Sequence, residues 1–282
     1  VHTRTGFFQE AINCFKKALA FKSDFAEAFF GLGRAYLDLG EHSKSIKSYN
    51  KVLELKPKHY STLHSLAWPM ILTKNFKKGW EMYEYRWHVE PQIKQNRPFK
   101  DRELWSGQKD KKVVLWREQG IGDDIIFLSL VPEAFKIART LSVYIDPRLI
   151  PLCKRSMPDI KFLPDENALK KEIFDYHSPM GSLPRLFRNS EKDFDRVIRG
   201  YLKADPKRVE LLRDELGLKG KKVVGISWKS IKASNKLKKS MALIDFKKIF
   251  ESLNITLVNL QYGDVDKEIK EFKKETGIEV LQ

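Results

Sequence analysis

Small and large side chains recur every 34 residues in the first third of the chain. Gly33 and Tyr49 are matched by Ala67 and Tyr83 one period later, and Tyr49 is matched by Phe15 one period earlier. A small residue that faces a large one at a constant offset lets two antiparallel helices pack closely and lets each pair stack on the next. This period therefore predicts an array of stacked helical hairpins.

The recurrence resembles the tetratricopeptide repeat (TPR). The resemblance implies a helical repeat domain over residues 1–87, with about half of one repeat, one whole repeat and a third that degenerates. In the third repeat we expect Pro69 to interrupt the first helix, while Trp80, Tyr83 and Trp87 form one apolar stripe on the second. We expect this stripe to dock the array on the following domain, and stacking against a ligand is the alternative. Repeat arrays present a concave face to peptides or proteins, which implies a protein partner.

Residues 88–112 show no apolar periodicity and are expected to form a linker. After this segment, short apolar runs alternate with helical stretches, which is typical of parallel sheets with right-handed crossovers. Two Rossmann-like domains are expected, over residues 113–203 and 204–282. The second has three predicted strands where an open doubly wound sheet has about five or six, so we expect it to be incomplete. The strands predicted in the first domain are 113–116, 141–145, 160–163 and 173–176, with a helix over 124–139 between the first two.

Composition narrows the range of partners. The formal charge of +16 can signal a nucleic-acid or membrane surface, but the lysines are interleaved with acids throughout the chain. We therefore expect a solvated basic surface and no nucleic-acid partner. The two cysteines, Cys14 and Cys153, lie far apart, which indicates a reducing compartment without disulfides or a zinc site. No apolar run approaches the roughly 18–20 residues that span a bilayer, so we expect a cytoplasmic protein without a membrane span or metal site.

A polar turn with two glycines, "REQGIGDD", follows the first predicted strand. Gly120 and Gly122 resemble the start of a dinucleotide fingerprint, but Ile125 stands where the third glycine or alanine belongs. Asp123 and Asp124 at a helix N-terminus would also repel a pyrophosphate, which disfavours a dehydrogenase-type site. Capping of the helix by one carboxylate is the plain alternative, although capping does not require two.

Five segments together resemble bacterial tetratricopeptide-repeat glycosyltransferases, which are related to the heptosyltransferase-like (glycosyltransferase family 9) enzymes of the GT-B fold. The resemblance extends from about Trp80 to the end of the chain. It implies GT-B-like twin Rossmann domains and transfer of a sugar from a nucleotide-sugar donor to a protein or glycan acceptor, with inversion and without a metal or other cofactor. The segments are WREQGIGDDIIFLSLVPE, DPRLIPLCKRSMP, SPMGSLPRLF, GYLKADP and VGISWKS…KKS…LQYG.

The resemblance assigns an acceptor side to the first Rossmann-like domain. Gly122-Asp123 matches the family's Gly-Asp turn, so Asp123 is expected to act as the general base that removes the proton of the acceptor hydroxyl. Asp124 is expected to cap the helix. The remaining residues expected to bind the acceptor are Gly120, Gly122, His177, Gly181 and Ser182, and for the last three a turn without a ligand is equally compatible.

The resemblance places the donor in the second domain. Lys239 and Ser240 match the family's Lys-Ser pair, and Ser227 and Lys229 lie near them in the sequence. Lysines and hydroxyls close to a helix start can neutralise a departing diphosphate without a metal. A solvated basic loop is the alternative for these residues. For the whole chain, the alternative to an enzyme is a non-catalytic TPR scaffold that carries a degenerate transferase domain.

Overall fold

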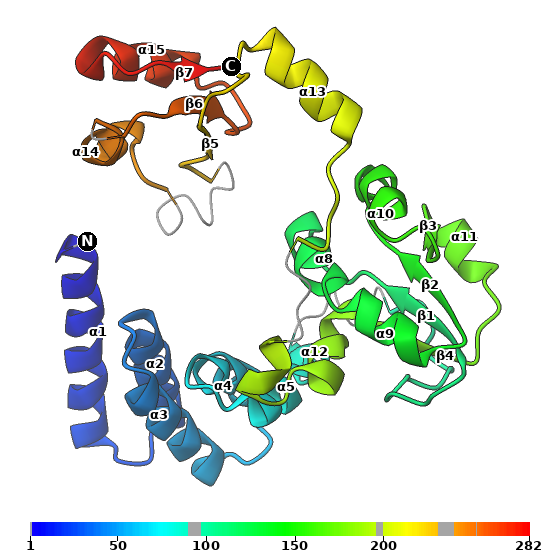
Figure 1. Cartoon of the computed structure of the whole chain (residues 1–282). Coiled ribbons are helices and arrows are strands. Elements are labelled where there is room, and N and C mark those ends of the chain that lie inside the picture. The colour runs from blue at the N-terminus through cyan, green and yellow to red at the C-terminus, as the bar shows by residue number, and fades with distance from the viewer. Residues whose placement is uncertain (1, 90–96, 196–199, 231–239, 252) are drawn as a thin grey trace. The chain divides into compact units, whose positions relative to one another are not determined.

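The computed structural model describes residues 2–89, 97–195, 200–230, 240–251 and 253–282. The chain forms two compact units, Val1–Lys203 and Ala204–Gln282. The first unit contains a helical array and a four-stranded parallel sheet, and the second contains a three-stranded parallel sheet (Figure 1). The fold class expected from the sequence, TPR helices followed by parallel α/β sheets, is confirmed.

The helical array forms because small residues lie opposite large ones. A Cβ atom at Gly33 would lie 2.5 Å from the ring of Tyr49, and one at Gly31 would overlap the ring of Phe15. Pro69 does not interrupt its helix as expected: it removes one backbone hydrogen bond near the C-terminal end, and the helix continues to Leu72. The helices are α1 (His2–Phe21), α2 (Ala26–Asp38), α3 (His42–Leu55), α4 (Tyr60–Leu72), α5 (Phe76–Tyr83) and α6 (Arg86–Val89).

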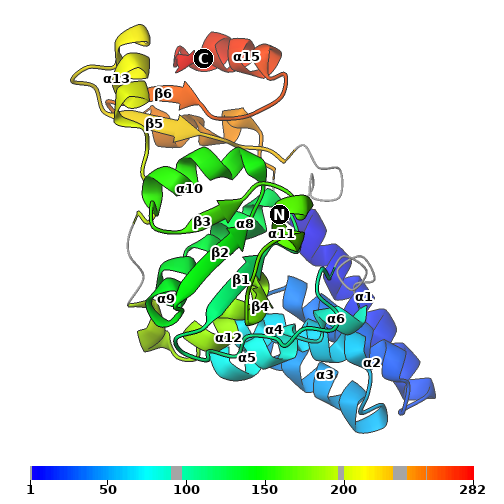
Figure 2. The same cartoon turned by 90° about the vertical axis from the view of Figure 1, so that its right-hand side faces the viewer.

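The first sheet has the strand order β3-β2-β1-β4, and all its strands are parallel (Figure 2). Its central strand β1 is buried from Val113 to Trp116, so both faces of the sheet are covered. The strands are β1 (Lys112–Trp116), β2 (Thr140–Tyr144), β3 (Lys161–Leu163) and β4 (Tyr176–Pro179). The helical segments are α8 (Ile121–Leu128), α9 (Val131–Ile137), η1 (Pro147–Leu149), α10 (Ile150–Ser156), α11 (Glu166–Lys170), η2 (Met180–Ser182), α12 (Leu183–Phe187) and η3 (Glu191–Phe194).

Two predicted boundaries in this sheet are wrong. The strand expected at 173–176 lies at β4, because Ile173 is exposed whereas the polar residues from His177 to Ser178 are buried. The helix expected over 124–139 is two helices, and it begins three residues earlier, at Ile121. This earlier start changes which carboxylate faces outward, as described below.

The third repeat packs on the first sheet, as its aromatic stripe predicts. The ring of Trp87 lies 5.8 Å from that of Trp116, centroid to centroid, and α5 packs beside α12 (Figures 1 and 2). The segment predicted to be a linker contributes to this unit as well, because Trp105 is buried in the core of the sheet. Trp80 lines a cavity of about 500 Å³ between the array and α8, α12 and η3.

The second unit has the strand order β5-β6-β7, again parallel. Asp205 is the N-cap residue of helix α13, and its carboxylate accepts hydrogen bonds from the backbone N–H groups of Lys207 and Arg208. The core lies around Trp228, Leu257 and Phe272. The elements are α13 (Pro206–Glu215), β5 (Val223–Ile226), η5 (Leu243–Phe246), α14 (Lys247–Phe250), β6 (Thr256–Asn259), α15 (Asp266–Thr276) and β7 (Val280–Leu281).

Candidate functional site

Asp123 lies in the first turn of α8, just after the segment that follows β1, at the carboxyl edge of the first sheet. It is the third residue of α8, and its Oδ2 accepts a hydrogen bond from the backbone N–H of Gly120 at 3.1 Å. The side chain is partly exposed, and within the part of the chain that the structure describes its Oδ1 has no hydrogen-bond partner. The carboxyl edge of a parallel sheet is where open α/β folds bind ligands. Asp123 therefore caps its helix with one oxygen and leaves the other available.

The neighbouring carboxylate has a different role. Asp124 is 1% exposed, and its Oδ2 lies 3.1 Å from Nε of Arg117 and accepts the backbone N–H of Asp146 at 3.2 Å. Burial raises the pKa of Asp124 to about 6, against the opposing effect of Arg117. The expectation that Asp124 caps the helix is wrong, because α8 begins at Ile121 and its first turn points this side chain into the sheet edge.

The two glycines of the turn are not required by the fold. Gly120 has an ordinary extended conformation, with φ −84° and ψ 171°, and a Cβ there would meet Oδ2 of Asp123 at a normal 3.6 Å. Gly122 is exposed within α8, and no atom lies within 4 Å of the position that its Cβ would take. Neither residue has a positive φ or a crowded neighbour. The surface beside Asp123 is thus open for a group to approach the backbone closely.

His177 does not face this surface, which contradicts its expected role in acceptor binding. It lies on β4 and is 0% exposed. Its Nδ1 accepts the indole N–H of Trp116 at 3.0 Å, and its Nε2 lies 3.2 Å from the carbonyl oxygen of Arg102. Burial lowers the pKa of the imidazole and keeps it neutral. Its role in the structure is to join β4, β1 and the preceding segment.

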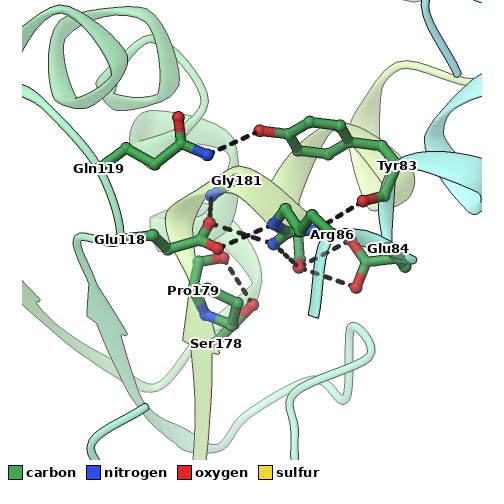
Figure 3. A network of polar contacts seen from close by, with 9 residues as sticks. Tyr83, Glu84, Arg86, Glu118, Gln119, Ser178, Pro179 and Gly181 are labelled. Atoms are coloured by element: carbon green, nitrogen blue, oxygen red, sulfur yellow. Dashed lines mark hydrogen bonds and ion pairs between the residues drawn. The ribbon is translucent and has the colours of Figure 1, made fainter. Parts of the chain in front are cut away.

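Gly181 and Ser182 are also buried, and they belong to the junction between the repeats and the sheet (Figure 3). The backbone N–H of Gly181 donates to Oε1 of Glu118 at 3.0 Å. Oγ of Ser182 accepts from Nη2 of Arg86 at 2.8 Å and donates to Oε1 of Glu84 at 2.8 Å. Their polar groups serve these contacts, which contradicts the expectation that they bind an acceptor.

Arg86 is the centre of this junction, and the sequence analysis did not single it out. Its side chain is fully buried, and it forms a bidentate pair with Glu118, with Nε–Oε2 at 2.9 Å and Nη2–Oε1 at 3.1 Å (Figure 3). Its Nη1 lies 2.8 Å from Oε1 of Glu84. The guanidinium carbon lies 4.6 Å from the ring centroids of both Tyr83 and Trp87. Burial raises the pKa of Glu118 despite the opposing charge of Arg86.

On the second sheet, the side chain of Gln261 organises the loop that follows β5. Its Oε1 accepts three hydrogen bonds, from Oγ of Ser227 at 3.1 Å and from the backbone N–H groups of Trp228 at 3.0 Å and Lys229 at 2.9 Å. Nζ of Lys229 pairs with Glu268 at 2.8 Å. Burial acts to raise the pKa of Glu268, but hydrogen bonds from Lys229 and Trp228 outweigh it and hold the pKa below its usual value. The charge of Lys229 is therefore balanced within the protein.

Ser240 lies beside the residues that follow β5. Its Oγ accepts the backbone N–H of Ser230 at 3.0 Å, and the backbone N–H of Met241 donates to the carbonyl oxygen of Trp228 at 2.9 Å. The structure thus brings Ser227, Lys229 and Ser240 together at the end of β5, as the sequence predicts. Lys239, the remaining predicted residue, lies outside the described residues. No group of three or more His, Cys, Asp or Glu side chains that could hold a metal occurs among the described residues.

Replacing Gln261 with alanine should loosen this loop. The change leaves the backbone N–H groups of Trp228 and Lys229 without their acceptor, and each unsatisfied buried donor costs about 1–3 kcal/mol. Gln261→Glu keeps an acceptor oxygen in the same place and should lose less. Hydrogen exchange at the amides of β5 and β6 measures the difference. An equal effect of both substitutions would show that the acceptor oxygen does not hold the loop.

Comparison with known proteins supports the repeat assignment. The tetratricopeptide repeat family matches residues 26–59, and a family described as TPR repeat matches residues 2–40. Over 292 aligned residues the chain is 26% identical to the protein FlbA of Caulobacter vibrioides, and this alignment covers 95% of the chain and 48% of FlbA. The chain therefore spans about half the length of that relative. None of the described helices has the length and apolar character needed to cross a membrane.

Solved structures also resemble parts of the chain. A crystal structure of MamA matches 31% of this chain and 52% of its own, with 24% identity and a TM-score of 0.28. A mutant O-GlcNAc transferase of Thermobaculum terrenum matches 99% of this chain and 72% of its own, with 14% identity and a TM-score of 0.30. At these TM-scores we draw no functional conclusion from the solved structures.

Proposed function

We propose that the chain belongs to a nucleotide-sugar-dependent glycosyltransferase that is inverting and metal-independent, with Asp123 as its general base. The observation that carries the proposal is the turn after β1. It offers a carboxylate oxygen without a partner among the described residues, at the ligand-binding edge of a parallel sheet. The two glycines beside it have no structural reason to be glycine. The order of sequence segments shared with TPR glycosyltransferases supports the same assignment.

The proposed reaction needs one proton acceptor on the acceptor side. Oδ1 of Asp123 takes the proton of the acceptor hydroxyl while that oxygen attacks the anomeric carbon of the donor sugar. The bond from the anomeric carbon to the diphosphate breaks, and its electron pair leaves with the nucleoside diphosphate. Ser227 and Ser240 supply hydroxyl groups for that diphosphate, with Lys239 as the proposed cation. The TPR helices would recruit a protein or glycan acceptor.

Titration calorimetry with UDP-, GDP-, ADP- and CMP-sugars tests the donor site. We expect one nucleotide class to bind in the micromolar range and Lys239→Ala to weaken its binding by about 10- to 150-fold, since loss of one charged contact costs about 1.5–3 kcal/mol. Lys270→Ala, on the exposed face of α15, removes the same charge outside the loop and serves as the matched control. Absence of binding for all four classes would reject the donor site.

The second candidate function is a non-catalytic TPR scaffold with a degenerate transferase domain. The positions of three predicted acceptor-binding residues favour the scaffold, because His177, Gly181 and Ser182 all form internal contacts. A scaffold predicts that the protein neither binds nor hydrolyses nucleotide-sugars, whereas the repeats still bind a protein partner. The calorimetric result therefore decides between the two candidates.

A further inference from the structure

The segment that leads to Asp123 is held by residues of the repeat array. Glu118 and Gln119 follow β1. The side chain of Glu118 accepts the backbone N–H of Gly181 in η2, and both side chains also reach the repeat array. Glu118 forms its bidentate pair with Arg86, and Nε2 of Gln119 donates to the hydroxyl of Tyr83 at 3.3 Å (Figure 3). Two successive residues of the turn thus depend on two side chains of the third repeat.

The other end of the turn is fixed within the sheet. Arg117 bonds to Asp124 through Nε at 3.1 Å and to Asp146 through Nη1 at 3.1 Å. Hydrogen bonds from Arg148, assisted by the charge of Arg117, hold the pKa of Asp146 below its usual value, so it stays charged. The sheet therefore holds Arg117 and Asp124, and Nη2 of Arg117 also donates to the carbonyl oxygen of Gln119 at 3.2 Å. The side chains of Glu118 and Gln119 reach the repeats.

The ion pair at the junction with the repeats is shielded from water because both of its charges are buried. Arg86 is 0% exposed and the side chain of Glu118 is 3% exposed, so neither can exchange its partner for water without opening the interface. The flat guanidinium also lies over the rings of Tyr83 and Trp87. The third repeat departs from the small-and-large pattern because it carries more aromatic residues. This contact explains the departure, since Tyr83 and Trp87 of the stripe pack against the arginine that contacts the turn.

We propose that the third repeat positions the base: Tyr83 and Arg86 act through Gln119 and Glu118 to set the Gly120–Asp123 turn at the edge of the sheet. The inference rests on the proposed function for its catalytic meaning. Tyr83 and Arg86 are positioning residues, because neither reaches the reacting atoms. A structural change in the repeats, such as one caused by a bound acceptor protein, is transmitted to Asp123 through these two side chains.

The test combines hydrogen exchange with kinetics on two variants. Tyr83→Phe removes the hydroxyl that accepts from Gln119 and keeps the ring over Arg86. Arg86→Lys keeps the charge but loses the bidentate geometry. The amides of Asp123 and Asp124, which donate to the carbonyl oxygen of Gly120 at 3.0 and 3.1 Å, report on the turn. We expect their exchange to accelerate about fivefold in Tyr83→Phe, the factor for loss of one hydrogen bond, and more in Arg86→Lys.

The matched control is Lys74→Ala, which removes an ion pair with Glu191 across the same junction. That pair is exposed, with 65% and 67% of its side chains accessible, so its loss should not change exchange in the turn. Unchanged exchange at Asp123 and Asp124 in both Tyr83→Phe and Arg86→Lys would overturn the proposal, whatever the activity of the protein.

Kinetics separate positioning from a general structural effect. In an active transferase, both variants should lower kcat and leave the KM of the nucleotide-sugar unchanged, because the donor loop lies in the other unit. A change in donor KM without a change in kcat would contradict positioning of the base. A protein with no transferase activity rejects the proposed function, and the exchange experiment then still decides whether the repeats hold the turn.

Discussion

Asp123→Asn is expected to lower the rate of sugar transfer by about 10²- to 10⁴-fold, the usual contribution of a general base. The amide has nearly the same shape as the carboxylate, but its oxygen cannot take a proton at neutral pH. The acceptor hydroxyl must then attack while still protonated. Because the acceptor and the donor sugar keep their contacts, the loss should fall on kcat. The measurement is the rate of nucleoside diphosphate release with saturating donor and acceptor.

The same substitution should leave the fold intact. The side-chain oxygen of asparagine can still accept the N–H of Gly120, and loss of the charge at the start of α8 costs about 0.3–1 kcal/mol. Asp193 provides a matched control in the same unit, since it holds the third position of η3 and accepts the backbone N–H of Ser190 at 2.8 Å. Asp193→Asn should cost similar stability and leave the rate unchanged.

Two results would count against Asp123 as the base. An undiminished rate in Asp123→Asn removes the residue from that role. Equal losses of rate in Asp123→Asn and Asp193→Asn would show that helix stability causes the effect. A rise in the rate of Asp123→Asn at high pH would instead support the role, because solvent hydroxide then replaces the missing base.

The repeats and the sheets are predictable from the sequence because they depend on local periodicity. Gly33 opposite Tyr49 is enough to indicate paired helices, and the run from Val113 to Trp116 is enough to indicate a buried strand. The prediction is poorer where polar residues are buried. The strand β4 lies at the edge of the sheet and includes His177 and Ser178, which are polar but buried, whereas the apolar Ile173 before it is exposed. Residue type alone therefore misplaced this strand.

An error of three residues in one helix start assigned the capping role to Asp124 instead of Asp123. With α8 beginning at Ile121, Asp123 reaches back to the N–H of Gly120 while Asp124 turns inward to Arg117. A glycine at the N-cap is a weak start signal, so periodicity alone did not locate this boundary. Asp123 as the base remains a prediction, and its position at the sheet edge is what the structure adds.

Arg86 shows what a single sequence hides. Within "YEYRW" a charged residue is expected to face solvent, because periodicity assigns burial by residue type. Its partner Glu118 lies 32 residues away, and the burial of each depends on the other. The signal that could have found it is the arginine itself, directly beside the aromatic stripe that was already expected to dock on the next domain.

Arg86→Met is expected to lower the free energy of unfolding of the first unit by about 3–5 kcal/mol at pH 8. The methionine keeps much of the apolar stem but leaves the carboxylate of Glu118 buried without its counter-charge. Urea unfolding followed by tryptophan fluorescence measures the loss, since five of the six tryptophans lie in this unit. The exposed-pair variant Lys74→Ala should lose no more than about 1 kcal/mol and is the control.

The loss of unfolding free energy in Arg86→Met should be smaller at acidic pH, and this pH dependence follows from the pKa of Glu118. Burial already raises the pKa of this carboxyl above its unfolded value, and removal of Arg86 raises it further. A group whose folded pKa is raised contributes stability below its unfolded pKa, near 4.3, and loses it as the pH rises through the folded pKa. The difference between Arg86→Met and the wild-type protein should therefore be smaller at pH 5 than at pH 8.

Adding Glu118→Gln to Arg86→Met should restore much of the lost stability at pH 8. The double variant has no buried charge at either position, and the glutamine oxygen can still accept the N–H of Gly181. Replacing both members of a buried ion pair costs far less than removing one, so the two substitutions should be strongly non-additive. Additive losses, or a loss from Arg86→Met that is the same at pH 5 and pH 8, would show that the uncompensated carboxylate is not the cause. The stability of the junction would then come from its packing contacts, among them those of Tyr83 and Trp87 with their neighbours.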